Sequence, residues 1–393
     1  MNHSTRATQQ TVVINATNIG SILDGIGTYG LNILRELGRL NTDHRFIVYL
    51  NTTARQHFMD MELPVNFSVR WVWPLMSPDF GFRGHLIRLI FANLLGLTLR
   101  KALLFNISQL EAVFFRSHQI LTIHDLIPLL FKKCHRKQFF YYKYFLKYAL
   151  RRADVLVTPS AHTKELLAQK YPLPPAKIRI VPNGVPRDLG PDTSIEKEQI
   201  IVYVGRIVRM KNVTGVLKAF ALMKDKVDHK LIIAGNGREA LKKEFEAGRL
   251  SRYHLDRVVF KGYVPTKEMH ALLKRASLLV FPSFYEGFGL PPLEAMSCGC
   301  PVVVSNVASL PEVCGDAAYY VDPHDVESIA HGMYTVLSND ELRQRLIEKG
   351  YQQAKLFRWD RVAESYLRLF NEHASARSGY AVQTELSLAI PPA

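Results

Sequence analysis

The sequence predicts an α/β fold with two parallel-sheet domains facing each other across a cleft, and three observations support this. Short apolar runs that suit buried strands alternate with helical patterns along the chain. The alternation stops at a proline-containing, polar stretch between residues 182 and 198 and then starts again. Glycine-rich turns follow several of the predicted strands, and the carboxyl ends of strands are where such sheets bind ligands.

The first half begins with a predicted strand at Val12–Ala16. A loop with Gly20, Gly25 and Gly27 follows, and then a helix to about Leu40. Further strands are predicted at Arg45–Leu50, Phe67–Trp73, Gln119–Ile123, Asp154–Thr158 and Lys177–Val181. Residues 111–117 fit neither pattern. We place this domain at residues 1–185.

The second half repeats the pattern after the linker. Its strands are predicted at Gln199–Val204, His229–Ala234, Arg257–Lys261, Leu278–Phe281 and Pro301–Ser305, each followed by a helical segment. We place this domain at residues 199–357. The last helices run from about Val326 to Phe370, and residues 374–393 are small and polar, so we expect a disordered tail there.

Composition and charge narrow the choice of partners. The 393 residues carry a net charge of +15, which favours an anionic partner such as a nucleotide, an anionic lipid surface or a nucleic acid. Residues 1–10 lack the apolar core of a signal peptide, and no run reaches the roughly 18–20 apolar residues of a membrane span. We therefore expect a cytoplasmic protein whose four cysteines are thiols.

The segment Phe281–Ala295 places two carboxylates, Glu286 and Glu294, around a strand-to-helix turn. Glycines in the turn leave backbone amides uncovered, and Pro291 and Pro292 suit the first turn of a helix. A helix N-terminus binds anions, and carboxylates accept hydrogen bonds from sugar hydroxyls. The alternative is an ordinary strand, turn and helix with solvated acids.

Arg206 and Lys211 are five residues apart across the turn that ends the first strand of the second half. A guanidinium and an ammonium at this spacing suit a diphosphate, although two solvated cations are the simpler interpretation. No Asp-x-Asp sequence occurs in the chain to hold a divalent ion. Cys298 and Cys300 have no second ligand pair at metal spacing, so we expect no metal and no other cofactor.

Three further turns carry polar or glycine residues. Ala234–Ala240 fits a dinucleotide-binding pattern, but it follows the second strand of its half, which argues against a nicotinamide enzyme. His124 and Asp125 follow a predicted strand of the first half and are either structural or functional. The turn Asp24–Gly30 lets a backbone approach a phosphate or an acceptor, or is a tight strand-to-helix turn.

The segment around Glu286 and Glu294 resembles the Glu-x7-Glu motif of the retaining glycosyltransferases of family 4, which have the two-Rossmann-domain GT-B fold. Arg206 and Lys211 are similar to the Gly-Arg-x4-Lys element of the same family. The resemblance spans Val12 to about Phe370 and is stronger in the second half. It also implies that residues 358–373 form a helix that crosses back to the first domain.

The resemblance implies roles for particular residues. The catalytic set would be His124, Glu286, Arg206 and Lys211. Donor contacts would come from Gly25, Gly27, Gly205, Gly235, Gly237, Val264, Gly287, Phe288, Gly289, Leu290 and Glu294. Asp125 and Tyr29 would meet the acceptor. The sugar would be transferred from a GDP- or UDP-linked donor, with mannose suggested by the Gly-Ile-Gly-Thr-Tyr and His-Asp-Leu-Ile-Pro segments.

Two basic segments, Arg83–Lys101 and Lys132–Arg152, interleave cations with aliphatic and aromatic residues. Such segments bind anionic membranes, bind nucleic acid, or are helices with solvated outer faces. Both lie in the half that binds the acceptor in this family, which favours a membrane-borne acceptor and no nucleic acid.

The expected function is therefore glycosyl transfer from a nucleotide-sugar to a glycan or a polyprenyl-linked acceptor in cell-surface polysaccharide or lipopolysaccharide synthesis, at the inner face of the membrane. The alternatives are a sugar-nucleotide epimerase of the same fold and a non-catalytic basic protein that binds membrane or nucleic acid.

Overall fold

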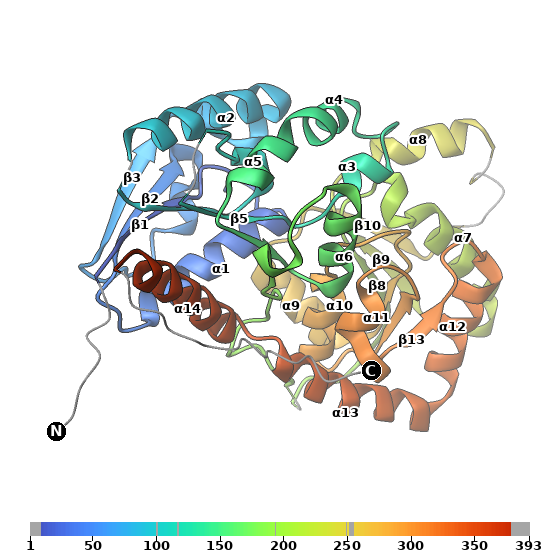
Figure 1. Ribbon diagram of the computed structural model, residues 1–393. Coiled ribbons are helices and arrows are strands. Elements are labelled where there is room, and N and C mark those ends of the chain that lie inside the picture. The colour runs from blue at the N-terminus through green and yellow to red at the C-terminus, as the bar shows by residue number, and fades with distance from the viewer. Residues whose placement is uncertain are drawn as a thin grey trace. The chain divides into compact units, whose positions relative to one another are not determined.

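Two compact units make up the chain. The computed structural model describes residues 9–99, 101–115, 118–192, 194–248, 250 and 255–378 (Figure 1). Unit 1 combines the described residues up to Asn183 with those from Trp359 onward, and unit 2 runs from Gly184 to Arg358. The predicted linker therefore belongs to unit 2, where the amide of Val185 donates to the carbonyl of Phe357 at 3.0 Å.

Among the described residues, a seven-stranded sheet forms the centre of unit 1. In spatial order its strands are β3 (Phe67–Val72), β2 (Arg45–Asn51), β1 (Thr11–Asn15), β4 (Leu103–Asn106), β5 (Gln119–Thr122), β6 (Val155–Thr158) and β7 (Ile178–Ile180). All neighbouring strands are parallel. Val12, Val13 and Ile14 of β1 are fully buried, as expected for a strand covered on both faces.

The described helices of unit 1 are α1 (Gly25–Arg39), α2 (Gly81–Thr98), α3 (Ile127–Leu130), α4 (Arg136–Phe140), α5 (Leu146–Arg152), α6 (Ala161–Lys170) and α14 (Trp359–Ser378). A π-helical segment, Tyr141–Phe145, joins α4 to α5. Helix α1 starts earlier than predicted because the Asp24 side chain accepts a hydrogen bond from the Gly27 amide at 2.8 Å. Gly25 and Gly27 therefore lie in the first helical turn and not in a loop.

Unit 2 has a six-stranded sheet within its described residues. Its order is β10 (Val258–Gly262), β9 (Lys230–Ala234), β8 (Glu198–Val204), β11 (Ala276–Phe281), β12 (Val302–Ser305) and β13 (Tyr319–Val321), and neighbouring strands are parallel. Its helices are α7 (Val213–Met223), α8 (Glu239–Glu246), α9 (Thr266–Arg275), α10 (Leu290–Ser297), α11 (Leu310–Cys314), α12 (Val326–Ser338) and α13 (Asp340–Leu356).

The last helix, α14, belongs to unit 1 (Figure 1). Trp359, Tyr366 and Phe370 are almost fully buried, and the rings of Phe105 and Tyr366 lie 4.6 Å apart. The helix continues to Ser378, and Ala374 is only 7% exposed. The prediction of a disordered tail from residue 374 is therefore wrong for residues 374–378, because the helix keeps an apolar contact there. Residues 379–393 lie outside the described residues.

Two strands were not predicted from the sequence. Strand β4 has four residues and β13 has three. Strands β5, β6, β7 and β12 are equally short and were predicted, so length alone does not explain the two omissions. Strand β4 also follows closely after the apolar helix α2, so its apolar residues merge with that helical pattern. Both strands extend the sheets on the side where the strand order has reversed, and the predicted parallel α/β architecture is confirmed.

Candidate active site

The switch point of the unit 2 sheet lies between β8 and β11, because the chain continues from β8 to β9 on one side and β11 lies on the other. The Val204–Asn212 and Phe281–Ala295 segments begin at the carboxyl ends of these two strands. Ligands of open parallel sheets bind outside the strand ends at such a point. The sheet topology therefore brings the two motifs to the place that most favours a ligand.

Lys211 and Glu286 form an ion pair at this place. The Lys211 Nζ lies 2.6 Å from each carboxylate oxygen of Glu286, and the two side chains are 20% and 8% exposed. The ammonium also lies 5.4 Å from the centre of the Phe281 ring. A charge covered to this extent needs a partner to offset its desolvation. Each residue is therefore the counter-ion of the other in this structure.

The loop that carries Glu286 is fixed by a serine of a neighbouring element. The Ser309 hydroxyl lies 3.0 Å from the carbonyl of Glu286 and 2.9 Å from that of Phe288. Gly289 then caps α10 with a φ of 110°, a conformation that disfavours side chains, and Leu290 starts the helix. Ser309 was not singled out from the sequence, since no spacing links it to the motif.

The backbone beside Lys211 is fixed by Asn212. This residue is left-handed, with a φ of 55°, and directly precedes α7. Its Nδ2 donates to the carbonyls of Pro282 and Pro323 at 3.1 and 2.7 Å. These bonds join the turn after β8 to the loops after β11 and β13. The position of Lys211 relative to the Glu286 loop is therefore set by a buried hydrogen-bonding side chain.

Arg206 follows β8 and is exposed, and its guanidinium has no ion-pair partner among the described residues. Its carbonyl accepts a hydrogen bond from the buried Tyr203 hydroxyl at 3.3 Å. Burial, and then the charge of Glu286, raise the pKa of Tyr203 well above its usual range. Tyr203 thus remains a donor, and Arg206 presents an exposed guanidinium in the same turn that carries Lys211.

Three predicted donor-binding glycines, Gly205, Gly235 and Gly237, have φ values of 143°, 154° and 107°. A Cβ on Gly235 would lie 1.9 Å from the carbonyl oxygen of Gly205, and one on Gly237 would lie 2.7 Å from that of Ile207. Close packing between the ends of β8 and β9 is therefore sufficient reason for these glycines. Their contact with a nucleotide stays a prediction.

Glu294 is the fifth residue of α10 and not part of its first turn, because the helix starts at Leu290, before the two prolines. Its side chain is 15% exposed, and Oε1 lies 3.7 Å from Nε2 of His270. The Glu294 carboxylate is thus partly accessible, and its ion pair with His270 is weak.

The remaining donor-binding predictions fall on partly or fully covered positions. Val264 follows β10 and packs partly buried against the unit 2 core. Phe288 is 5% exposed, and its ring centre lies 5.7 Å from that of Phe357. Gly287 is buried, while Leu290 is half-buried. The side chain of Phe288 therefore supports the loop from inside, and donor contacts by these residues stay a prediction.

In unit 1, His124 follows β5 and is 9% exposed. Its amide donates to Oε1 of Gln109 at 3.0 Å, and its Nε2 lies 2.7 Å from the carbonyl of Ile107. Because a carbonyl only accepts, Nε2 carries the proton and Nδ1 keeps its lone pair. Burial lowers the pKa of His124 to about 4, although the bond to Ile107 opposes this. The imidazole is therefore neutral near pH 7.

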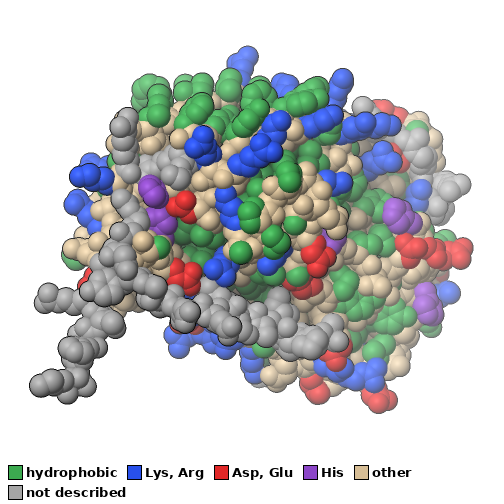
Figure 2. All heavy atoms as spheres, in the orientation of Figure 1, with side chains coloured by type: hydrophobic (Ala, Val, Ile, Leu, Met, Phe, Trp, Pro, Cys, Tyr) green, Lys and Arg blue, Asp and Glu red, His purple; other side chains and the backbone are tan. Residues whose placement is uncertain are grey.

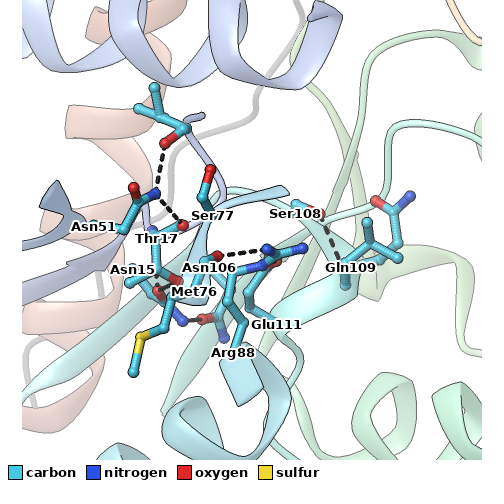
Figure 3. Close-up of polar contacts among 12 residues, drawn as sticks. Asn15, Thr17, Asn51, Met76, Ser77, Arg88, Asn106, Ser108, Gln109 and Glu111 are labelled. Carbon is cyan, nitrogen blue, oxygen red and sulfur yellow. Dashed lines mark hydrogen bonds and ion pairs between the residues drawn. The ribbon is translucent and has the colours of Figure 1, made fainter. Parts of the chain in front are cut away.

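A buried polar cluster surrounds the unit 1 switch point between β1 and β4 (Figure 3). Asn15 Nδ2 donates to Asn106 Oδ1 at 3.2 Å. Arg88 Nε donates to Glu111 Oε1 at 2.7 Å and its Nη1 to the Met76 carbonyl at 2.5 Å (Figure 3). Arg88 and Glu111 are 3% and 0% exposed. Arg88 is thus a buried structural cation, whereas the sequence grouped it with a basic surface segment.

The two predicted acceptor residues differ in their positions. Asp125 Oδ1 accepts a hydrogen bond from the Ile127 amide at 2.9 Å and so starts α3. Tyr29 is 1% exposed, and its hydroxyl contacts those of Thr122 and Tyr366. Tyr29 is therefore a core residue and not an acceptor contact, because α14 covers it. An acceptor role for Asp125 stays a prediction.

The glycines of the first turn of α1 are under different constraints. Gly25 is exposed, with no atom within 4 Å of a Cβ position, whereas a Cβ on Gly27 would lie 3.2 Å from the Leu23 side chain. The open space at Gly25 leaves room for a ligand. The donor contacts of Gly25 and Gly27 stay predictions.

Helix α2 presents its apolar side outward. The exposed large apolar side chains on it are those of Phe82, Leu86, Ile90, Leu94 and Leu97, which are 45–57% exposed. Its polar Arg88 and His85 point inward and are 3% and 7% exposed. Figure 2 shows hydrophobic side chains gathered over α2 with Lys and Arg side chains beside them. The exposed face of α2 is therefore mainly apolar, and its contact with a membrane stays a prediction.

The second basic segment adjoins this apolar face. Lys137 Nζ of α4 lies 4.7 Å from the ring centre of Phe82 on α2. The exposed aromatic residues of the segment are Phe140, Tyr144, Phe145 and Tyr148, interleaved with lysines and arginines. Of the helices in the described ranges, none combines the length and apolarity needed to cross a bilayer. Below, "the α2–α5 surface" means these exposed residues of α2, α4, the π-helical segment and α5.

Two family profiles match adjoining parts of the chain. One, described as Glycosyltransferase Family 4, matches residues 23–189, and the other, described as glycosyl transferases group 1, matches residues 188–353. The chain belongs to glycosyltransferase family 4. The two matches meet within a few residues of the start of unit 2, so each sheet has its own family profile.

Several mannosyltransferases are related to the chain in sequence. It is 42% identical to the O-antigen chain mannosyltransferase B of Escherichia coli over 40% of this chain and 42% of that protein. It is 30% identical to the O-antigen chain mannosyltransferase RfbU of Salmonella typhimurium over 54% of this chain and 58% of that protein. The serotype-specific mannosyltransferase WbdA of Escherichia coli is 28% identical over 67% and 34%. Each alignment covers less than two thirds of the relative.

Solved structures share the fold. Sucrose-phosphate synthase from Thermosynechococcus elongatus superposes with a TM-score of 0.74 at 19% identity, over 94% of this chain and 100% of that chain. WaaG, a glycosyltransferase involved in lipopolysaccharide biosynthesis, superposes with a TM-score of 0.63 at 15% identity, over 91% and 99%. The predicted GT-B fold is thereby confirmed.

Proposed function

We propose that the protein is a retaining glycosyltransferase that moves a sugar, mannose in our proposal, from a nucleotide-sugar to a glycan or a polyprenyl-linked acceptor. The observation that carries this proposal is the covered Lys211–Glu286 pair at the unit 2 switch point, with the unpaired Arg206 following the adjacent strand. The family membership and the related O-antigen mannosyltransferases support it.

Donor binding would exchange the partners of this ion pair. A diphosphate would take the Lys211 ammonium and the Arg206 guanidinium, and the hydroxyls of the sugar would donate to the Glu286 carboxylate in place of Lys211. The charge of Lys211 would then be paired with the diphosphate, and the charge of Glu286 would be stabilised by hydrogen bonds from the sugar hydroxyls. The ribose would be bound by Glu294, the second carboxylate of the segment.

The leaving diphosphate gains negative charge as the sugar departs. Arg206 and Lys211 would stabilise that charge without a metal ion, and Asn212 holds Lys211 in place before the reaction. We propose that the acceptor attacks the same face of the sugar from which the diphosphate leaves. The acceptor hydroxyl would pass its proton to the departing phosphate oxygen, which gives retention without a protein nucleophile.

His124 would orient the transferred sugar as a neutral hydrogen-bonding group. Its Nε2 proton is engaged by the Ile107 carbonyl, so only its Nδ1 lone pair can accept from a sugar hydroxyl. A histidine in this state does not act as a general acid near pH 7. His124 would therefore position the sugar, and residues of unit 2 would stabilise the charge of the leaving diphosphate.

A screen of nucleotide release tests this function. The protein is offered GDP-mannose, UDP-glucose, UDP-galactose and UDP-N-acetylglucosamine with a lipid extract as acceptor, in the presence of excess EDTA. We expect release from one donor, GDP-mannose, that depends on the extract and persists with the chelator. Loss of turnover in EDTA with recovery in magnesium would refute the metal-free reaction, and conversion of a donor without release of nucleotide would favour the epimerase.

We also propose that the protein acts peripherally on the inner face of the cell membrane. The α2–α5 surface supports this, because exposed apolar residues alone would face water at a cost of roughly 25 cal/mol per Å². The apolar residues of α2 would enter the boundary between headgroups and acyl chains, and the lysines of α4 would meet anionic headgroups. An acceptor carried on a lipid would then be reached at the membrane.

A further inference from the structure

Three side chains meet at the amino-terminal edge of the unit 1 sheet. His118 directly precedes β5, Asp154 directly precedes β6, and His373 lies on α14. Their ligand atoms all lie within 4.8 Å of one another, and no other such group of His, Cys, Asp and Glu occurs among the described residues. Residues from three distant parts of the chain form this cluster, so no sequence spacing points to it.

The distances suit a tetrahedral ion. Asp154 Oδ2 lies 3.3 Å from His118 Nδ1 and 3.0 Å from His373 Nε2. Zinc binds imidazole nitrogen and carboxylate oxygen at about 2.0–2.1 Å, so two tetrahedral ligands stand about 3.3 Å apart. The carboxylate therefore already has both histidines near ligand separation. The two histidine nitrogens lie within 4.8 Å of each other, so zinc binding would require them to approach to about 3.3 Å.

The surroundings favour a bound cation at this cluster. The side chain of His373 is 8% exposed, and its second nitrogen, Nδ1, lies 3.0 Å from Nε2 of Gln10. With zinc on Nε2 of His373, Nδ1 would carry a proton, and the Gln10 amide would have to turn so that its Oε1 accepts that proton as an outer-shell partner. The side chains of His118 and Asp154 are 39% and 32% exposed, which leaves solvent access for a fourth ligand.

One nearby charge opposes metal binding. The Lys177 ammonium interacts electrostatically with the Asp154 carboxylate. Its Nζ donates to the Arg151 carbonyl at 2.6 Å. Lys177 therefore reduces the affinity of the cluster for a cation and does not occupy the ligand positions.

We propose that His118, Asp154 and His373 bind one Zn²⁺ ion, with water as the fourth ligand. Two imidazoles and one carboxylate are ligands that zinc accepts, and a partly exposed fourth position is compatible with its geometry. The ion would tie the end of α14 to the edges of β5 and β6. It lies at the opposite end of β5 from His124, about 20 Å away at 3.3 Å per residue. The site is therefore structural and separate from the proposed metal-free transfer.

Zinc titration of chelator-treated, untagged protein tests this proposal. We expect one Zn²⁺ per chain by calorimetry and by elemental analysis, and a rise in melting temperature on the order of 5 °C at a hundredfold excess over the dissociation constant. Cobalt in place of zinc should give the visible bands of a tetrahedral nitrogen and oxygen site, without the charge-transfer band of a thiolate.

Two conservative variants locate the ion. Asp154→Asn and His373→Gln should each lower zinc affinity at least tenfold, whereas His331→Gln, which changes an exposed histidine on α12, should not. Circular dichroism and nucleotide release confirm that the variants are folded. Absence of stoichiometric zinc binding, or binding that both variants retain, would overturn the proposal. If EDTA lowers the melting temperature but nucleotide release continues, the zinc site is separate from the transfer reaction.

Discussion

Lys211 and Glu286 offset each other's charge at the unit 2 switch point, so replacing either residue changes stability and chemistry together. Glu286 is 8% exposed in its side chain and Lys211 20%. Removing one partner leaves a covered, uncompensated charge, which is usually more costly than removing the pair. The effects on stability and on catalysis can be separated. Stability depends on the charge of the partner that remains, whereas catalysis depends on the charge that contacts the donor.

Lys211→Ala should lower kcat/KM by roughly 30- to 1,000-fold, the equivalent of about 2–4 kcal/mol of stabilisation of the leaving group. It should also lower the free energy of unfolding by about 3 kcal/mol, because Glu286 keeps its charge without a partner. Urea unfolding and nucleotide release measure the two losses.

The double variant Lys211→Ala/Glu286→Gln is the matched control. It should recover much of the stability and none of the activity, since the uncompensated carboxylate is gone but the diphosphate still lacks its cation. If stability fell further in the double variant, the ion pair would not be the cause of the first loss.

His124 gives a prediction about pH. Its pKa is lowered by burial to about 4 in the folded state, against 6.5 ordinarily. The unfolded chain therefore binds more protons between these values, and stability that is present above pH 6.5 is lost as pH falls toward 4. This one group should cost roughly 2 kcal/mol between pH 7.5 and pH 5.

His124→Gln should reduce that pH dependence in urea unfolding, and His331→Gln, on the surface, should leave it unchanged. His85, whose pKa burial also lowers to about 4, supplies part of the remaining slope. An unchanged slope in His124→Gln would mean that the residue is already protonated, or not buried, in the folded protein.

At the scale of elements, the sequence predicted the strands that have five or more residues and the order in which strands and helices alternate. It also predicted four shorter strands but missed β4, whose apolar residues follow closely after the apolar helix α2, and the three-residue β13. The Glu286 and Lys211 motifs could be recognised because short local spacing defines them. Ser309 and Asn212 could not, since their contacts depend on tertiary packing that spacing does not record.

The reversed orientation of α2 is a second feature that the sequence did not reveal. A helix with arginines among leucines is expected to be amphipathic and to expose its cations. Arg88 instead pairs with the buried Glu111, so an apolar side of α2 is exposed. A partner on another element, 23 residues away, therefore decided which face is exposed.

The ends of β8 and β9 give a prediction about packing. Gly235→Ala would place a Cβ 1.9 Å from the Gly205 carbonyl oxygen at a φ of 154°, so the two turns would have to separate. We expect a loss of roughly 3 kcal/mol in unfolding free energy, from strain and overpacking together. Gly190→Ala is the matched control in the same unit, because no atom lies within 4 Å of its Cβ position. Equal stability of the two variants would contradict the close approach.

The α2–α5 surface gives a prediction about membranes. Ile90→Gln and Leu94→Gln together should reduce binding to anionic vesicles at least tenfold, because both side chains would enter the lipid. Replacing Lys132, Lys133, Arg136 and Lys137 with Gln should remove the salt-dependent part of the binding. Leu222→Gln, which alters an equally exposed leucine of unit 2, is the control.

Cosedimentation with vesicles measures these effects, and donor affinity should stay intact in every variant, since the donor would bind unit 2. Wild-type protein that ignores anionic vesicles at low salt but binds single-stranded RNA there would contradict the membrane assignment.

At the scale of the whole molecule, the two units divide the proposed work. Unit 2 carries the cations and carboxylates proposed for the donor, and unit 1 carries His124 and the α2–α5 surface. Helix α14 belongs to unit 1 although it follows unit 2 in the chain, so the chain passes between the units twice. A variant that fails in donor binding should therefore keep membrane binding, and the reverse should hold as well.

The anomeric configuration of the product tests the central claim most directly. The protein is incubated with GDP-α-mannose and the lipid-linked acceptor fraction, and the one-bond carbon–hydrogen coupling at the new anomeric centre is measured by NMR. We predict an α-linked mannose, formed by the wild-type protein and greatly reduced in Glu286→Gln. A β-linked product would contradict it, because inversion requires a general base on the opposite face of the sugar instead of a departing phosphate that takes the proton.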